Sequence, residues 1–143
     1  MKKKGVGAAA FIVNAAGEIL LVKHTYGRLN WELPGGGAED NESPVETAVR
    51  EAREETGLTV AARHMTRYYY DTASDSIHFV FRCERENAAA PEPDHAEISE
   101  CQYWPPDALP RPISDWTVRR IRDALAGETF GLPTRIGERV LLE

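Results

Sequence analysis

Two hydrophobic periods run along this chain, one typical of β-strands and one typical of α-helices. Residues 76–85 show the first period, since Ile77, Phe79, Phe81 and Cys83 alternate with their neighbours in the manner of a half-buried strand. Apolar runs bounded by turn residues predict further strands at 8–13, 18–23, 30–33, 58–70, 98–104 and 135–143. A hairpin is expected between 8–13 and 18–23, and pairing is expected between 58–70 and 76–85.

The helical period is clearest over residues 44–56. Ser43 and Glu46 form a capping box around Pro44, and Gly57 is placed to end the helix. A narrow stripe on this helix is expected to face a sheet, and it consists of Val45, Ala48, Val49, Ala52 and Thr56. Ala48 and Ala52 are small, so the helix can approach the sheet closely.

A second helix is predicted over 114–125, with Ser114 as its N-cap. Val118, Ile121 and Leu125 form its expected apolar stripe, and Trp116 lies off that stripe. The glycines at 35–37 are expected in a loop after the strand at 30–33. Strands and helices together predict a mixed α/β fold in one domain, residues 1–143.

Composition adds limits on partners and compartment. The chain has 42% hydrophobic and 28% charged residues and a net charge of −6, which argues for a soluble globular protein without a surface for long nucleic acids. Cys83 and Cys101 match no metal or disulfide spacing, and residues 2–13 imitate a signal peptide without its usual apolar core. No run approaches the roughly 18 apolar residues of a membrane span. We therefore expect a cytoplasmic protein that binds no membrane.

The helix at 44–56 carries an unusual group of acids. Glu51, Glu54 and Glu55 fall within about 100° of one another on the helical wheel, where like charges cost roughly 0.2–0.5 kcal/mol per pair. One interpretation is a solvated face on which Arg50 offsets the repulsion. The glycines just before the helix favour a second interpretation, a site for a hard divalent cation. A ligand can approach a glycine backbone closely, and the converging carboxylates beside it offer the oxygen ligands that such a cation prefers.

The segment 36–58 resembles the Nudix box, a pattern of glycine, acids and arginine with fixed spacing. Its positions fall on Gly36, Glu42, Arg50, Glu51, Ala52, Glu54, Glu55, Gly57 and Leu58. Ala52 is smaller than the usual aliphatic residue there. Asn41 stands where many members have glycine, and asparagine tolerates the left-handed conformation that a turn requires. The order of elements also resembles the Nudix domain, which implies an α/β/α sandwich with a mixed central sheet and the box helix packed on it.

The resemblance implies hydrolysis of a phosphoanhydride bond in a nucleoside diphosphate linked to another moiety, with Mg²⁺ or Mn²⁺ as cofactor. By analogy the metal would be held by Glu51, Glu54, Glu55 and Gly36. Arg50 would orient the carboxylates, and Glu42 would brace the loop or contact metal through water. A further acid from a later loop is expected to be Glu97, with Glu100 as the alternative.

Substrate contacts are expected from residues 23–31 and from the glycines. Tyr26 could stack on a base and Arg28 could meet a phosphate, beside Gly36 and Gly37. We expect a small nucleotide, with a slight preference for nucleoside triphosphates over nucleotide sugars or dinucleotides. The protein is expected to be a monomer or a homodimer. The alternative function is a non-catalytic sensor domain that binds a nucleotide or a protein, but the complete set of acids favours an enzyme.

Overall fold

The computed structural model describes residues 3–142 and contains, in that part of the chain, seven strands and two helices. In chain order they are β1 (Gly5–Ile12), β2 (Ile19–His24), β3 (Trp31–Glu32), β4 (Gly35–Gly37), α1 (Pro44–Thr56), β5 (Val60–Asp71), β6 (Ser76–Arg85), β7 (Ile98–Trp104) and α2 (Asp115–Leu125). Neither helix in this part is long and apolar enough to cross a bilayer.

The strands form two sheets. One has the order β4-β1-β6-β5, with β1 and β6 parallel and the other pairs antiparallel. The second has the order β3-β2-β7 and is antiparallel throughout. The expected pairing of β5 with β6 is confirmed, and parallel and antiparallel pairs occur together as predicted.

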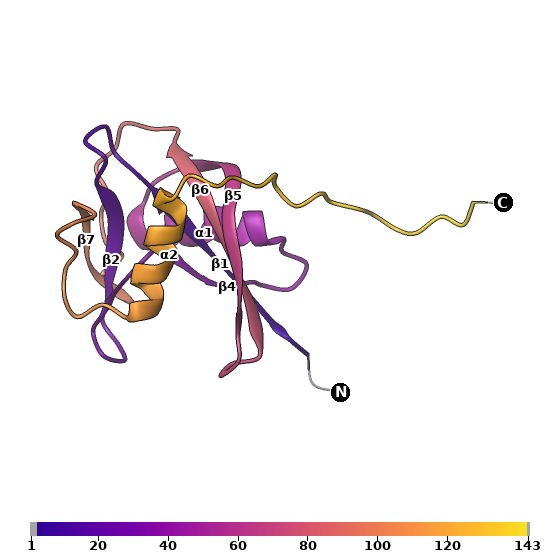
Figure 1. The fold of residues 1–143 in the computed structure, drawn as a ribbon, viewed down its shortest axis with the longest axis horizontal. Helices are drawn as coiled ribbons and strands as arrows, with labels where there is room; N and C mark the ends of the chain where they lie inside the picture. The colour runs from indigo at the N-terminus through magenta and orange to yellow at the C-terminus, as the bar shows by residue number, and fades with distance from the viewer. Residues whose placement is uncertain (1–2, 143) are drawn as a thin grey trace.

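The two helices lie on opposite sides of the larger sheet, α2 in front and α1 behind in the view of Figure 1. The side chains of β1 alternate between two hydrophobic clusters: Ala8, Ala10 and Ile12 pack with Ala48 and Ala52 of α1. Ala9 and Phe11 pack with Ile121 of α2 in the other cluster. The predicted α/β/α sandwich, with the acid-rich helix packed on a mixed sheet, is confirmed.

Helix α1 has the bounds and caps that its sequence predicts. The Ser43 hydroxyl accepts a hydrogen bond from the backbone N–H of Glu46 at 3.1 Å, and Gly57 ends the helix with φ of 75°. Asn41 takes the left-handed conformation, with φ of 61°, as expected for its turn. This agreement reflects the fact that caps are set by residues close in sequence.

The hairpin expected between 8–13 and 18–23 is wrong. Strands β1 and β2 belong to different sheets, and their segments are joined at the turn by an isolated bridge between Val13 and Ile19 and by a hydrogen bond from the Asn14 N–H to the Glu18 carbonyl. Residues 7–12 and 19–22 are buried on both faces of their strands. A strand covered on both faces has no polar side, so its pattern does not reveal which neighbour it pairs with.

Three other predictions need correction. Residues 35–37 form strand β4 instead of a loop, because the glycines allow close pairing with β1: a Cβ at Gly35 would lie 2.5 Å from the Ala8 carbonyl oxygen. The expected strand at 135–143 is absent from its described part, 135–142. On α2, Ile121 is buried, but Leu125 is 48% exposed, so the apolar stripe is shorter than predicted.

Candidate active site

The acids of α1 meet the glycine strand β4 through Glu55. Its side chain is buried, and Oε1 accepts a hydrogen bond from the backbone N–H of Gly35 at 2.9 Å. Burial raises the pKa of the Glu55 carboxyl well above its usual range, and the neighbouring Glu51 carboxylate raises that pKa further. Negative charge at this position is thus unfavourable without a compensating cation.

Glu51 lies directly against the next glycine. A Cβ at Gly36 would come within 2.7 Å of Glu51 Oε1, a distance that real Cβ atoms do not show. Glycine at position 36 therefore makes room for the carboxylate beside the β4 backbone. This contact gives a physical reason for the glycine and the glutamate to occur together.

Arg50 holds several of these acids at once. Its Nε and Nη2 donate to the two oxygens of Glu42 at 2.7 and 2.9 Å, and Nη1 donates to Glu51 at 2.9 Å and to Glu54 at 3.1 Å. Nη2 also donates to the Gly37 carbonyl at 3.0 Å. Glu46 and Glu54 each lie four residues from Arg50, and Arg50 pairs with Glu54. Glu46, the other, pairs with Arg135 instead.

These contacts shift the pKa values of both partners in the direction of the charged forms. Hydrogen bonding to Arg50 lowers the pKa of Glu42 to about 2, and the Glu42 carboxylate raises the pKa of Arg50. Glu42 also accepts from the Thr47 hydroxyl at 2.7 Å and from the Glu39 backbone N–H at 3.1 Å. Glu42 thus braces the segment between β4 and α1.

In residues 3–142, no three His, Cys, Asp or Glu side chains are arranged as a metal site. The donor set nevertheless fits a hard divalent cation. Glu51, Glu54 and Glu55 offer carboxylate oxygens, the ligand type that Mg²⁺ prefers. Ionising the buried Glu55 carboxyl next to the Glu51 carboxylate is unfavourable, and a bound cation would remove that cost.

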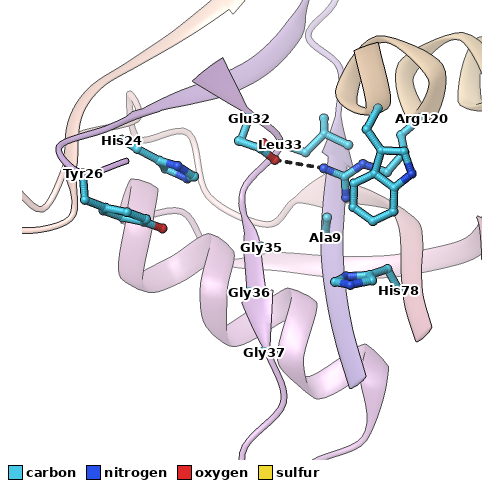
Figure 2. Close-up of a pocket in the computed structure, with 11 residues that line it drawn as sticks. Ala9, His24, Tyr26, Glu32, Leu33, Gly35, Gly36, Gly37, His78 and Arg120 are labelled. Atoms are coloured by element: carbon cyan, nitrogen blue, oxygen red, sulfur yellow. Dashed lines mark hydrogen bonds and ion pairs between the residues drawn. The ribbon is translucent and has the colours of Figure 1, made fainter. Parts of the chain in front are cut away.

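A cleft of about 280 Å³ opens beside β4. Figure 2 shows His24 and Tyr26 on one side of the glycine strand, and Arg120 and His78 on the other. The rings of His24 and Tyr26 are stacked, with centroids 4.6 Å apart. Trp116 also lines the cleft, and its ring and the His78 ring form a T-shaped contact with centroids 5.1 Å apart.

Arg120 is the most unusual group in this cleft, because its residue is only 5% exposed. One nitrogen donates to Glu32 Oε2 at 3.0 Å, and the guanidinium lies 5.1 Å from the Trp116 ring centre. Its buried Nε has no hydrogen-bond partner among the described residues. Burial lowers the pKa of Arg120, and the Glu32 carboxylate opposes that shift.

The structure places the predicted substrate residues in different locations. Tyr26, Gly36 and Gly37 line the cleft. Arg28 instead lines a separate small hollow with residues 112–114, so its predicted role receives no support from this geometry.

The two candidates for the additional acid also differ. Glu100 is half-exposed and lies 3.6 Å from Lys23. Glu97 is close enough to Tyr26 for its charge to raise the pKa of that phenol, after the larger effect of burial and together with Glu55. Glu97 is therefore better placed than Glu100 to be the additional acid beside the cleft. This role stays a prediction.

Sequence reasoning missed several residues of the site: Glu32, His78, Asp94, Trp116 and Arg120. Asp94 accepts three backbone hydrogen bonds, from residues 96, 97 and 98, and its charge raises the pKa of Glu55. A signal for Trp116 and Arg120 did exist, since they lie four residues apart on α2 and off its apolar stripe.

The NUDIX domain family profile matches residues 3–124. The chain belongs to the Nudix family. This membership and a relative that is named as a phosphatase support the predicted class of the protein, that of the Nudix pyrophosphohydrolases. Nudix hydrolases generally use divalent metal cations.

Three similar proteins illustrate the range of the match. A MutT-like protein of Streptomyces ambofaciens is 30% identical over 122 residues, which cover 85% of this chain and 77% of that protein. Phosphatase NudJ of Escherichia coli K12 is 34% identical over 98 residues, 66% of this chain and 64% of NudJ. An ADP-ribose pyrophosphatase structure from Streptococcus suis has a TM-score of 0.75 at 23% identity, covering 87% of this chain and 91% of that one. This last likeness concerns the fold.

Proposed function

We propose that this Nudix domain hydrolyses a phosphoanhydride bond in a small nucleotide with Mg²⁺ or Mn²⁺. The substrate class is a nucleoside triphosphate, or a nucleoside diphosphate linked to a sugar or a second nucleotide. The observation that carries the proposal is the junction of α1 and β4, where Glu51 and Glu55 lie against glycines beside an open cleft.

The metal would be held by Glu51, Glu54 and Glu55, with Gly36 as a further candidate ligand. When bound, a divalent cation neutralises charge on the phosphoryl oxygens and polarises the attacking water. Arg50 keeps Glu51 and Glu54 in position through Nη1, and the Gly35 N–H fixes one oxygen of Glu55. Glu97 is the proposed additional acid from the loop before β7.

The walls of the cleft suit the rest of the nucleotide. Tyr26 and Trp116 offer aromatic surface for a base or another flat group. The Arg120–Glu32 pair offers donors and acceptors to polar groups that enter the cleft. Glycines at 36 and 37 let phosphate groups approach the β4 backbone closely.

The test is phosphate or nucleotide release from a panel of nucleoside triphosphates, nucleotide sugars, ADP-ribose and dinucleotides, with Mg²⁺ and then with Mn²⁺. We expect at least one member to be cleaved, complete loss of activity in EDTA, and recovery when metal is restored. Turnover that continues in chelator would contradict the mechanism. A panel that binds but is not cleaved would instead support the sensor alternative.

A further inference from the structure

The chain after α2 crosses the edge of the larger sheet and reaches the far side of the molecule. Phe130 and Met65 of β5 exchange two backbone hydrogen bonds of 2.8 Å, and Glu128 pairs with Arg67 at 2.9 Å. Further along, residues 132–135 and residues 43–46 line one hollow together at the start of α1. Up to Arg135 the tail is therefore held against the α1 side of the sheet.

Beyond Arg135 the tail leaves the body of the molecule, as Figure 1 shows. Residues 136–142 contain four large apolar side chains that are 78–93% exposed: Ile136, Val140, Leu141 and Leu142. Such a concentration of exposed apolar side chains in one short segment is typical of a contact surface.

An apolar patch lies on the same side of the sheet. Strand pairing aligns Tyr70, Ile77 and Val6 in one row across β5, β6 and β1, and Tyr68 and Phe79 in the next. Paired residues on neighbouring strands point to the same face. Phe79 packs against the cluster under α1, so both rows face the α1 side.

This β-face patch, namely Val6, Tyr68, Tyr70, Ile77 and Phe79, extends past the end of α1. Tyr68 is 63% exposed, Tyr70 is 55% exposed and Val6 is 39% exposed. Three of its members line a hollow of about 500 Å³ whose rim carries Glu39 and Asp40. The cation at that rim, Lys4, is already paired with Asp75 at 2.6 Å.

We propose that residues 136–142 of the same chain bind over the β-face patch. Pro44 lines both the hollow that holds residues 132–135 and the hollow of the patch, so the two are adjacent. Seven residues span up to about 25 Å, which is ample for this step. The apolar residues of the tail match the patch, and Arg139 between them can meet the acidic rim.

The tether favours the chain's own tail over a tail from a second copy. Because residues 132–135 already lie beside the patch, the tail acts at a high effective concentration there. Binding would also touch residues 38–42, the segment that carries Glu42, the partner of Arg50. The tail would thereby cover the outer side of the loop that precedes the acids of α1.

The experiment places a nitroxide label at the end of the full chain in the variant Leu142→Cys and measures amide intensities by NMR. The label reacts at the introduced thiol, because burial raises the pKa of Cys83 and of Cys101 to about 12. We expect the amides of Val6, Tyr70 and Ile77 to lose most of their intensity. Amides of α2, on the other side of the sheet, serve as the internal control and keep theirs.

Two comparisons make the result decisive. Adding Ile136→Asp and Leu141→Asp to the labelled chain should restore the lost intensities, while the matched change Glu138→Gln in the same segment should not. In a mixture of labelled chains without isotope and isotope-labelled chains without nitroxide, no loss is expected. Intensity loss at the patch in that mixture would show that a second copy covers it, and no loss in any sample would show a free tail. Either result would overturn the proposal.

Discussion

Two arginines lie near the cleft of this protein in opposite environments. Arg50 on α1 donates to three carboxylates and one carbonyl, and its pKa is raised. Arg120 on α2 is nearly fully buried and its pKa is lowered; among residues 3–142 it has one carboxylate partner, and its Nε has no hydrogen-bond partner. Both are placed by helices, but only the first has its hydrogen-bonding capacity filled by the protein.

The difference separates a group that stabilises the site from one that is available to a ligand. A guanidinium surrounded by carboxylates fixes their positions and offsets their repulsion. A buried guanidinium with an unfilled donor carries a desolvation cost that the protein alone does not offset. We infer that Arg50 organises the acids proposed to bind metal, whereas Arg120 is the residue proposed to contact the substrate.

The largest expected effect is on kcat, and it comes from changing Glu55, one of the acids of α1. Glu55→Gln should lower kcat by about 10²–10³-fold, a loss typical of removing one group that stabilises charge in the transition state. In the absence of metal its free energy of unfolding should stay the same or rise, since the change removes a carboxyl whose pKa is raised by burial and by Glu51, and with it the cost of keeping that carboxyl uncharged. Steady-state kinetics and denaturant unfolding in EDTA measure the two quantities.

The matched control for this change is Glu46→Gln, at the other end of the same helix, which should leave kcat unchanged. A loss of more than about 1 kcal/mol in metal-free Glu55→Gln would mean that this carboxylate is a structural partner and not a metal ligand.

Arg50→Gln should come next in size and should act on stability. Removing the cation leaves Glu42 and Glu51 partly buried without their partner, which is expected to cost about 3 kcal/mol. Arg50→Lys keeps the charge without the planar fork and should lose less. Urea unfolding of both variants gives the comparison, and equal losses would indicate that bidentate geometry is unimportant here.

Arg120→Gln should behave differently from Arg50→Gln. We expect KM to rise about tenfold with little change in kcat, the result typical of lost ground-state binding. The loss of stability should be smaller than for Arg50→Gln, because only one carboxylate, that of Glu32, loses its partner and the desolvation cost of the buried guanidinium disappears. Arg119→Gln, the exposed neighbour, is the control. Destabilisation as large as that of Arg50→Gln would remove the distinction between the two arginines.

The smallest expected effect is on stability at low pH, and it involves Glu42. The folded-state pKa of Glu42 is lowered to about 2, so its contribution to stability is full above the unfolded pKa and is lost as pH falls toward 2. The free energy of unfolding should therefore decline below about pH 4.5. In Glu42→Gln this decline should be shallower. Identical slopes in the two proteins would mean that Arg50 does not hold Glu42 in the charged form.

Local features of this fold could be predicted well. The bounds of α1 and β6 match the expected ranges 44–56 and 76–85, because caps and alternation depend on neighbours in sequence. The pairing of β1 was missed, since a strand buried on both faces gives no sign of its neighbours. Trp116 and Arg120 were missed as site residues because a helical wheel shows a face without showing what lies opposite it.

By itself, the sequence determined the acid-rich helix, the glycines before it and, through their spacing, the Nudix family. Those features are short in range, and each follows from residues within one or two turns of one another. Only the tertiary structure decided which groups share the cleft. Glu32, His78 and Arg120 are separated by dozens of residues, and strand order and helix packing bring them together. The desolvation that shifts the pKa values of Glu55 and Arg120 also arises only when the core closes around them.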